Sequence, residues 1–418
     1  MIRPGLTVLS ILAINAAHAS TVVGSHTSID PTMKSPLLVQ TLDSGQTWSA
    51  KEIIGLDESV SAFLRTSTCS DSICIAGGNT VDLQGLLVQS LDHGNTWATV
   101  DVEDLGYRPL MGSSCENDHC ILIGNGDSNQ SVIVQTFDAG ETWKVFEPRT
   151  MQDNIKYILS DVKCKNDYCI VVGAKWIQEE IDVTPMWLES FDKGRTWKMT
   201  VQKIPGIFSH VDCSDTRCVA IGQDVIKFPM PMLYEISTTA SFRPKRTQLE
   251  ELFGIFTSVS CNQLTCVVTG ETVRALLDTA PLQVFIAESQ EVGDWEHQMI
   301  DNADKKGKPV LLDVDCSDSY CLAVGNIQRN NNVEGVVLSN RNGSWENETL
   351  PFEGSTAMML HTTHCDNTHC YVAGKQNDGT ALLMQKMQRG NWAIINPVGM
   401  FDTAHFYSRP TAVRAFVE

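Results

Sequence analysis

The sequence has few positive charges and, after its first residues, no long apolar run. It contains 31 lysines and arginines against 50 aspartates and glutamates, which gives a formal net charge of −19. An acidic field of this size repels nucleic acid and anionic membranes, so neither is expected as a partner. No segment is basic, proline-rich or low enough in complexity to form a linker or a disordered tail. We therefore expect one folded unit without a membrane span.

Residues Met1–Ala19 have the features of a secretory signal peptide. An apolar run, Leu6–Ala17, follows a short segment with one arginine, and Ala17-His18-Ala19 is an A-x-A cleavage site. A membrane anchor is the alternative, but the run contains Asn15 and is shorter than the ~20 residues that a spanning helix needs. We expect a mature protein of residues 20–418, a single domain exported to the periplasm or the extracellular space.

No cysteine stands outside a repeating pair. The 14 cysteines form Cys-x4-Cys pairs, and a glycine always falls four residues after the second cysteine. The first cysteines are 46, 49, 49, 48, 55 and 49 residues apart, and a period near fifty with strand-like content is typical of a repeat architecture. The pairs are Cys69/Cys74, Cys115/Cys120, Cys164/Cys169, Cys213/Cys218, Cys261/Cys266, Cys316/Cys321 and Cys365/Cys370.

A second phrase, S/T-x-D-x-G-x-T-W, alternates with the cysteine pairs. It occurs at Thr41–Trp48, Ser90–Trp97, Thr136–Trp143 and Ser190–Trp197. Shortened copies stand at Ser289–Trp295, Ser339–Trp345 and Lys386–Trp392, and a degenerate one near Ser237–Pro244. The phrase resembles the Asp-box of the BNR-repeat, sialidase-like β-propeller superfamily, and the resemblance covers essentially the whole mature chain.

The residues of this box are expected to be structural. The aspartate can accept backbone N–H bonds, the glycine supplies a positive φ, and the tryptophan can pack between neighbouring sheets. In the family that the sequence resembles, these boxes lie away from the active-site face. The residues concerned are Asp43, Gly45, Trp48, Asp92, Gly94, Trp97, Asp138, Gly140, Trp143, Asp192, Gly194 and Trp197.

Each repeat divides into four short strands, which predicts an all-β propeller of four-stranded antiparallel blades. The first strand runs into the first cysteine, the second leaves the second cysteine, the third precedes the box and the fourth starts at its tryptophan. Ser20–Gly24 resembles a second strand, so the first blade lacks its own first strand. Ser408–Phe416 is the candidate to supply that strand and close the ring. We expect eight blades, with seven as the alternative.

Each cysteine pair is expected to bridge the first and second strands of a blade. Opposed residues of an antiparallel pair have about the separation that a disulfide needs, and closing such a short loop stabilises by about 2 kcal/mol. Zinc binding is the alternative, but two pairs would have to converge from different blades, and an oxidising compartment disfavours thiolates. His361, His364 and His369 resemble a ligand cluster, yet we expect them to flank a strand and its turn. We therefore predict no metal and no cofactor.

Strand order predicts where a ligand would bind. The connections between the second and third strands, and between one blade and the next, emerge at one end of the ring and vary in length, and variable loops on a rigid scaffold carry binding. We call this end the variable face. Its candidate ligand residues are Arg65, Arg108, Arg149, Trp176, Glu179, Glu180 and Asp182.

The resemblance raises the alternative of a sialidase-like glycoside hydrolase. Such enzymes are expected to show three converging arginines, a tyrosine–glutamate pair and an F/Y-R-I-P motif. Phe242-Arg243-Pro244 and Tyr107-Arg108-Pro109 both lack the isoleucine. We predict instead a non-enzymatic, monomeric binding protein with a protein or glycan ligand at the variable face. Sequons at Asn129, Asn342 and Asn347 matter only in a glycosylating host.

Overall fold

The computed structural model describes most of the chain after the predicted signal peptide. The described residues are 20–27, 34–43, 45–57, 59–70, 72–126, 131–148, 155–177, 182–224, 230–239, 243–249, 254–272, 283–300, 307–329, 332–341, 343–352, 358–376, 381–387, 390–395 and 404–405. Every regular element in these ranges is a β-strand. Within them, no helix has the length and apolar character required to traverse a bilayer.

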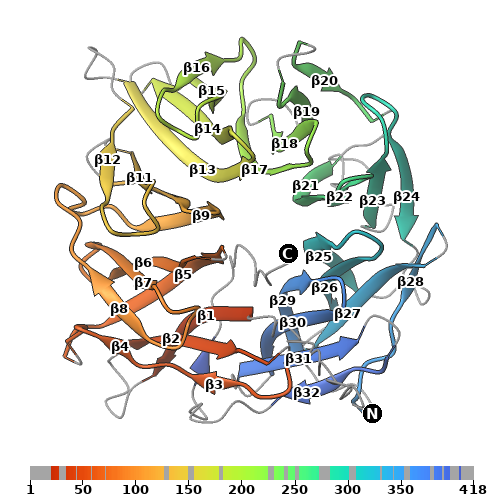
Figure 1. Ribbon diagram of the computed structural model, residues 1–418. Coiled ribbons are helices and arrows are strands. Elements are labelled where there is room, and N and C mark those ends of the chain that lie inside the picture. The colour runs from red at the N-terminus through yellow and green to blue at the C-terminus, as the bar shows by residue number, and fades with distance from the viewer. Residues whose placement is uncertain are drawn as a thin grey trace, which may run out of the picture.

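Seven four-stranded antiparallel blades, each made of consecutive strands, follow one another around a ring (Figure 1). In chain order they contain β5 (Ala62–Cys69), β6 (Cys74–Thr80), β7 (Gly85–Ser90) and β8 (Trp97–Val100); β9 (Leu110–Glu116), β10 (His119–Gly124), β11 (Val132–Thr136) and β12 (Lys144–Phe146); β13 (Ile155–Lys165), β14 (Tyr168–Ile177), β15 (Asp182–Ser190) and β16 (Lys198–Val201); β17 (Ile207–Cys213), β18 (Arg217–Gln223), β19 (Pro231–Ser237) and β20 (Lys245–Thr247); β21 (Gly254–Cys261), β22 (Cys266–Thr272), β23 (Val284–Ser289) and β24 (Glu296–Ile300); β25 (Lys308–Cys316), β26 (Cys321–Arg329), β27 (Asn332–Arg341) and β28 (Ser344–Asn347); and β29 (Met358–Cys365), β30 (His369–Gln376), β31 (Ala381–Met387) and β32 (Ala393–Ile395). The fold is therefore a β-propeller.

An eighth blade made of four consecutive strands is not found in the described chain. The remaining sheet has the order β3-β2-β1-β33 and contains β1 (Ser20–Thr27), β2 (Lys34–Thr41), β3 (Ser49–Ala50) and β33 (Ala404–His405). The contact between β1 and β33 spans two residue pairs. The expected closing strand, Ser408–Phe416, lies outside the described residues, as does the predicted signal peptide. A short strand, β4 (Ile53–Ile54), adds in parallel to the outer edge of β8.

All seven predicted disulfides are present, and each joins the first and second strands of a blade. The bonded cysteines are direct partners in the ladder, and their Cα atoms are 3.9 to 4.1 Å apart. The described residues contain no free cysteine. Sequence spacing was sufficient to predict this pairing because the hairpin turn leaves each first cysteine only one opposite residue. The bonds are Cys69–Cys74, Cys115–Cys120, Cys164–Cys169, Cys213–Cys218, Cys261–Cys266, Cys316–Cys321 and Cys365–Cys370.

The second cysteine of each pair is also a buried core residue. Cys218 is fully buried in the same apolar cluster as Phe208, and Cys370 is fully buried in the same cluster as Val372. The reason is that each second strand is covered on both sides by neighbouring sheets, so the cysteine at its start is enclosed as well. Cys218 and Cys370 are therefore scaffold residues that a ligand cannot reach.

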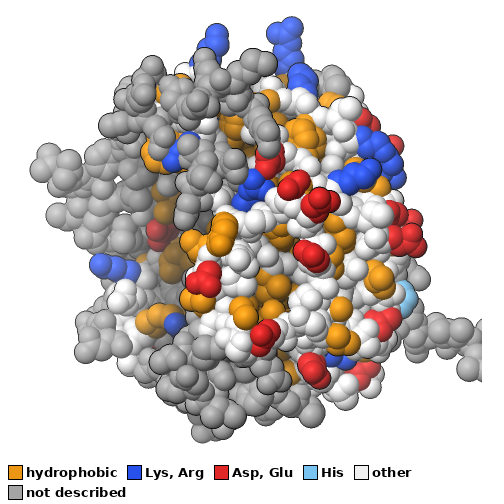
Figure 2. All heavy atoms as spheres, turned by 90° about the vertical axis from the view of Figure 1, so that its left-hand side faces the viewer, with side chains coloured by type: hydrophobic (Ala, Val, Ile, Leu, Met, Phe, Trp, Pro, Cys, Tyr) orange, Lys and Arg blue, Asp and Glu red, His pale blue; other side chains and the backbone are white. Residues whose placement is uncertain are grey.

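The hydrophobic core lies between blades. One cluster joins Ile121 and Ile133 of the β9–β12 blade to Leu159 and Val171 of the next blade, and the other clusters follow the same pattern. Each sheet therefore buries both faces, which explains why second strands such as Cys120–Gly124 are continuously apolar. On the outer side shown in Figure 2, acidic and hydrophobic side chains are interspersed.

The four intact boxes form identical turns. In the second of them, Ser90 Oγ accepts the Gly94 N–H at 2.7 Å, while Asp92 accepts both the Thr96 N–H at 2.9 Å and the Thr96 hydroxyl at 2.7 Å. The box glycines have φ between +81° and +88°, a region that other residues enter only with strain. The box aspartates therefore hold the turns.

Three of the four tryptophans of the intact boxes also bond to the preceding sheet. The Trp97 Nε1–H donates to Gln40 Oε1 at 3.1 Å, and the Trp143 Nε1–H donates to Gln89 Oε1 at 3.0 Å. In both cases the glutamine directly precedes the hydroxyl residue of the preceding box. The Trp48 Nε1–H makes the same bond, at 3.3 Å, to Gln385 of the last blade.

The substitution Asp138→Asn tests the role of the box carboxylates. Hydrogen bonds from Thr142, first from its hydroxyl and then from its N–H, lower the pKa of Asp138 from 3.8 to about 2. A lowered pKa in the folded state stabilises the protein above pH 3.8, and this contribution disappears as the pH falls through about 2. Thermal unfolding should thus show a lower midpoint for the variant at neutral pH and a difference that shrinks as the pH falls to about 2 and below. A difference in unfolding midpoint between the variant and the wild type that does not change with pH would contradict this role.

Candidate functional site

A cavity of about 480 Å³ is enclosed by the first strands of the seven blades. Its lining residues come from β5, β9, β13, β17, β21, β25 and β29, the strands that lie nearest the centre of the ring (Figure 1). Gln223 and Ile255 extend it toward the variable face, where β18 ends and β21 begins. The cavity is therefore the central channel of the propeller.

Every first strand has a β-bulge, and the bulged residue lines the channel. In each of the seven ladders between first and second strands, the pairing register skips the residue four positions before the first cysteine. Bulges re-aim side chains, and these seven residues all border the cavity. We call them the bulge ring: Arg65, Met111, Ser160, Ser209, Thr257, Leu312 and His361.

The bulge explains the glycine that follows each cysteine pair. A Cβ on Gly78 would lie 1.8 Å from the carbonyl oxygen of Phe63, and one on Gly173 would lie 1.9 Å from that of Ile158. Gly222, Gly325 and Gly374 have the same contact at 2.0 Å. Since these atoms belong to the backbone they cannot move aside, so the bulge and the glycine form one structural unit.

Side chains of one blade hold the first strand of the next. Asp161 Oδ2 accepts the Val211 N–H at 3.0 Å, and Asp212 Oδ2 accepts the Cys261 N–H at 2.8 Å. There are two kinds of bond. In one, the residue three before a first cysteine accepts from the residue two before the first cysteine of the next blade. In the other, the residue directly before a first cysteine accepts from the N–H of the next first cysteine itself. The other bonds of this kind are Ser114 to Cys164, Ser258 to Val314, Ser260 to Cys316, Asp313 to Thr363 and Asp315 to Cys365.

Asp313 is a carboxyl group of the channel with a raised pKa. It borders the cavity, although protein surrounds it, and this desolvation raises its pKa to about 6. Its oxygens accept bonds from the Ser258 hydroxyl at 2.8 Å, the Thr362 hydroxyl at 2.7 Å and the Thr363 N–H at 3.0 Å. Burial also lowers the pKa of His361 to about 4, so this imidazole is neutral at physiological pH.

The structure separates the arginines that the sequence singled out. Arg65 lines the channel, and its Nε–H donates to Asn79 Oδ1 at 2.7 Å. Arg108 is not part of the lining; its guanidinium lies 2.5 Å from both the Asp104 carbonyl oxygen and Glu147 Oε1. Arg149 lies outside the described residues. Arg65 and Arg108 are therefore not brought together at one site.

Two of the remaining candidates belong to the third blade. Trp176 is on β14, where Lys156 Nζ lies 5.3 Å from its ring centroid, a cation–π distance. Asp182 begins β15, and its backbone pairs with Ile177. Glu179 and Glu180 lie outside the described residues. The sequence thus indicated Arg65 as a ligand candidate but not the bulge ring as a set. The sequence signals of the ring are its constant distance from the first cysteine and the glycine four residues after the second cysteine.

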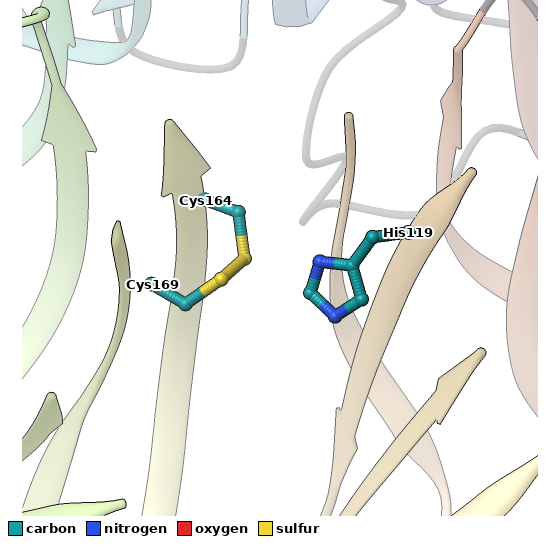
Figure 3. Close-up of side chains that lie close together, drawn as sticks. All are labelled: His119, Cys164 and Cys169. Atoms are coloured by element: carbon teal, nitrogen blue, oxygen red, sulfur yellow. A yellow bond between two sulfur atoms is a disulfide. The ribbon is translucent and has the colours of Figure 1, made fainter. Parts of the chain in front are cut away.

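One group of side chains in the described residues has the spacing of a metal site. His119, Cys164 and Cys169 have potential ligand atoms within 4.8 Å of one another (Figure 3). The two sulfur atoms form a disulfide, however, and so offer no thiolate. His119 stacks on Phe137, with ring centroids 5.0 Å apart, and burial lowers its pKa to about 4. The oxidised group is therefore an interblade packing contact.

The three C-terminal histidines are dispersed around one hairpin. His361 is in the bulge ring, and His364 Nδ1 lies 2.7 Å from Asp315 Oδ2. The backbone N–H of His369 donates to Asp366 Oδ1 in the turn. The imidazoles of His364 and His369 both stack against Tyr371, with ring centroids 6.5 and 6.1 Å from it.

The chain matches no family model, and it matches no curated protein. It does resemble solved propellers. A structure described as YCF48 bound to D1 peptide is 11% identical, with a TM-score of 0.46, over 78% of this chain and 94% of that one. The BP39L lectin from Burkholderia pseudomallei is 11% identical, with a TM-score of 0.49, over 79% and 98%. An acylaminoacyl peptidase bound to a chloromethyl ketone is 8% identical, with a TM-score of 0.51, over 80% and 52%, so this chain spans about half of that enzyme. At these identities the likeness shows the fold alone.

Replacing Asp212 tests the bonds between first strands. Asp212→Ala removes the acceptor of the Cys261 N–H and the partner of Lys163, whose Nζ lies 2.5 Å away in a pair that is mostly buried. Leaving a buried donor unsatisfied costs about 1–3 kcal/mol, and denaturant unfolding should register this loss.

Asp215→Ala is the matched control. Asp215 pairs with Lys165 across the same two blades, but the pair is 3.6 Å apart and its side chains are 39% and 50% exposed. Such a surface pair contributes about 0–1 kcal/mol. Equal losses in the two variants would contradict the interblade role of Asp212.

Proposed function

We propose that this protein is an exported Asp-box propeller that acts by binding a segment of a partner protein at the variable face, with the central channel as part of the site. The bulge ring carries the proposal. Seven equivalent backbone positions present Arg65, Met111, Ser160, Ser209, Thr257, Leu312 and His361 to one cavity. A purely structural repeat has no need for such varied chemistry at positions that the scaffold makes equivalent.

The lining is suited to a polypeptide. The bulge ring presents three successive hydroxyl groups, an imidazole and a cation together with the aliphatic side chains of Met111 and Leu312, and four aspartates also line the channel. Sites of this kind, mostly apolar with a few convergent polar groups, orient ligands of mixed polarity. Phe256 is the aromatic ring that the described lining includes, and it is buried in the interblade core. A protein segment therefore fits better than a glycan, which is the second ligand class to test.

The proposed location follows from redox chemistry. Seven disulfides in one chain persist in an oxidising compartment, and a secretory signal at residues 1–19 would direct the chain there. The periplasm and the extracellular space both meet this requirement. The protein is proposed to act there as a monomer.

The ring is proposed to contain eight blades, the eighth formed by both ends of the chain. Two observations support this. Leu37, Val39 and Trp48 of the first sheet share a core cluster with Tyr371 and Leu383 of the last blade. The bond from Trp48 to Gln385 also repeats the interblade bond of the other boxes. A strand near the C-terminus, at or beyond β33, would complete this blade.

A channel-filling substitution tests the proposed site. Labelled wild-type protein and the Ser160→Trp variant are applied to a peptide array and a glycan array. We expect a set of peptides to bind the wild type and to lose at least about tenfold in affinity with the variant, because the indole would occupy the cavity.

The matched control is Gln263→Trp, which places the same side chain on an exposed turn at the opposite end of the ring. It should bind as the wild type does. Peptide binding that Ser160→Trp leaves unchanged would contradict the channel site. Hits confined to the glycan array, and lost with Ser160→Trp, would assign a sugar ligand to the same cavity.

A further inference from the structure

Two adjacent connections of the variable face expose large apolar side chains. Val81 and Leu83 lie between β6 and β7 and are 59% and 40% exposed, and Tyr107, between β8 and β9, is 64% exposed. The Gly85 N–H donates to the Gly106 carbonyl at 2.9 Å, which joins the two connections. We call Val81, Leu83 and Tyr107 the apolar tip.

Leu83 is in a conformation that leucine rarely adopts. Its φ is +66°, in the left-handed region where glycine and asparagine are favoured. The turn is closed around it by bonds from Leu83 N–H to the Thr80 carbonyl at 3.0 Å and from Thr80 N–H to the Gln84 carbonyl at 2.9 Å. An exposed leucine thus costs stability at this position, where glycine or asparagine would cost less. Strain of this kind is concentrated at functional sites.

The connection between β8 and β9, which carries Tyr107, is held rigid by Arg108 and Leu105. The Arg108 guanidinium donates to the carbonyl oxygens of Asp104 and Leu105 and pairs with Glu147 of the following blade. Leu105 is itself buried in the interblade core. Tyr107 is therefore presented on a pre-organised loop, and such loops lose less entropy on binding. Arg108 is in this sense a positioning residue for the tip.

The surroundings of the tip are acidic. Asp82, Asp101, Glu103 and Asp104 are exposed on the same two connections. Neither Val81–Gln84 nor Asp101–Tyr107 contains a lysine or an arginine. An apolar centre with a negative rim is complementary to a ligand with an apolar side chain between positive charges.

We propose that the apolar tip binds a partner-protein segment in which lysine or arginine flanks a large apolar side chain. This inference rests on the proposed function, since it names the chemistry of the partner, but it concerns a surface separate from the channel lining. The apolar side chain would contact Leu83 and Tyr107, and the cations would lie against the four carboxylates. Because these charges are exposed, binding should weaken as salt is added.

The test uses short synthetic peptides in which one leucine or tryptophan is flanked by lysines, and the same peptides with glutamate in place of lysine. We expect the lysine peptides to bind the full-length protein and the glutamate peptides not to bind. Leu83→Asn should reduce this affinity at least about tenfold. Asparagine tolerates the left-handed conformation, so the variant should unfold at the same or a higher temperature.

Leu264→Asn is the matched control, because Leu264 is 72% exposed on a turn at the other end of the ring. It should leave peptide affinity unchanged. The proposal is overturned if Leu83→Asn binds as the wild type does, or if the glutamate peptides bind equally well. It is also overturned if the wild type uses the tip to self-associate in sedimentation experiments or to bind anionic vesicles.

The two proposals fail in different ways. Array peptides that are sensitive to Ser160→Trp but not to Leu83→Asn would remove the tip and leave the channel site. Lysine peptides lost with Leu83→Asn but unaffected by Ser160→Trp would leave the tip as the binding surface. If neither substitution changes any peptide binding, both proposals are wrong.

Discussion

The structure depends on how the first strand of each blade, the strand nearest the ring axis, pairs the backbone N–H groups on its free edge. A first strand is an edge strand, and edge strands present unpaired N–H groups that cost free energy when water cannot reach them. Here the donors are paired with side chains of the preceding blade, as Val211 is with Asp161 and Cys365 is with Asp315. The same bonds fix the rotation of one blade against the next, so the ring is held near its axis by polar contacts and farther out by apolar ones.

Bulge, disulfide and glycine act together at each first strand. The disulfide fixes the hairpin end of the ladder, and the bulge four residues earlier turns one side chain toward the axis. The glycine opposite the bulge accepts the displaced backbone, because no Cβ fits there. All of these positions are constrained by geometry except the bulged side chain itself. The bulged residue can therefore vary from arginine to leucine without disturbing the scaffold. A binding specificity can reside at these positions.

Much of this arrangement was predictable from the sequence, and the features that were not predicted depend on contacts that a local pattern does not reveal. The disulfides and box turns depend on residues close together in the chain, so spacing alone predicts them. The bulge ring was missed because a strand is read with a period of two, and a bulge shows only when the backbone is seen to approach Gly78 or Gly173. Arg108 was expected at the ligand face, yet Glu147 engages it from 39 residues away. In the described chain β1 pairs with Ala404–His405, and the predicted closing strand, Ser408–Phe416, lies outside the described residues.

Hydrogen exchange at individual amides tests the interblade bonds most directly. The N–H groups of Val211, Cys261 and Thr363 point out of their own sheets, and each is bonded to an aspartate of the preceding blade. If these bonds organise the ring, the three amides exchange as slowly as amides within the central ladders. Exchange as fast as in exposed turns would mean that the first strands are not held in this way, and it would contradict the account.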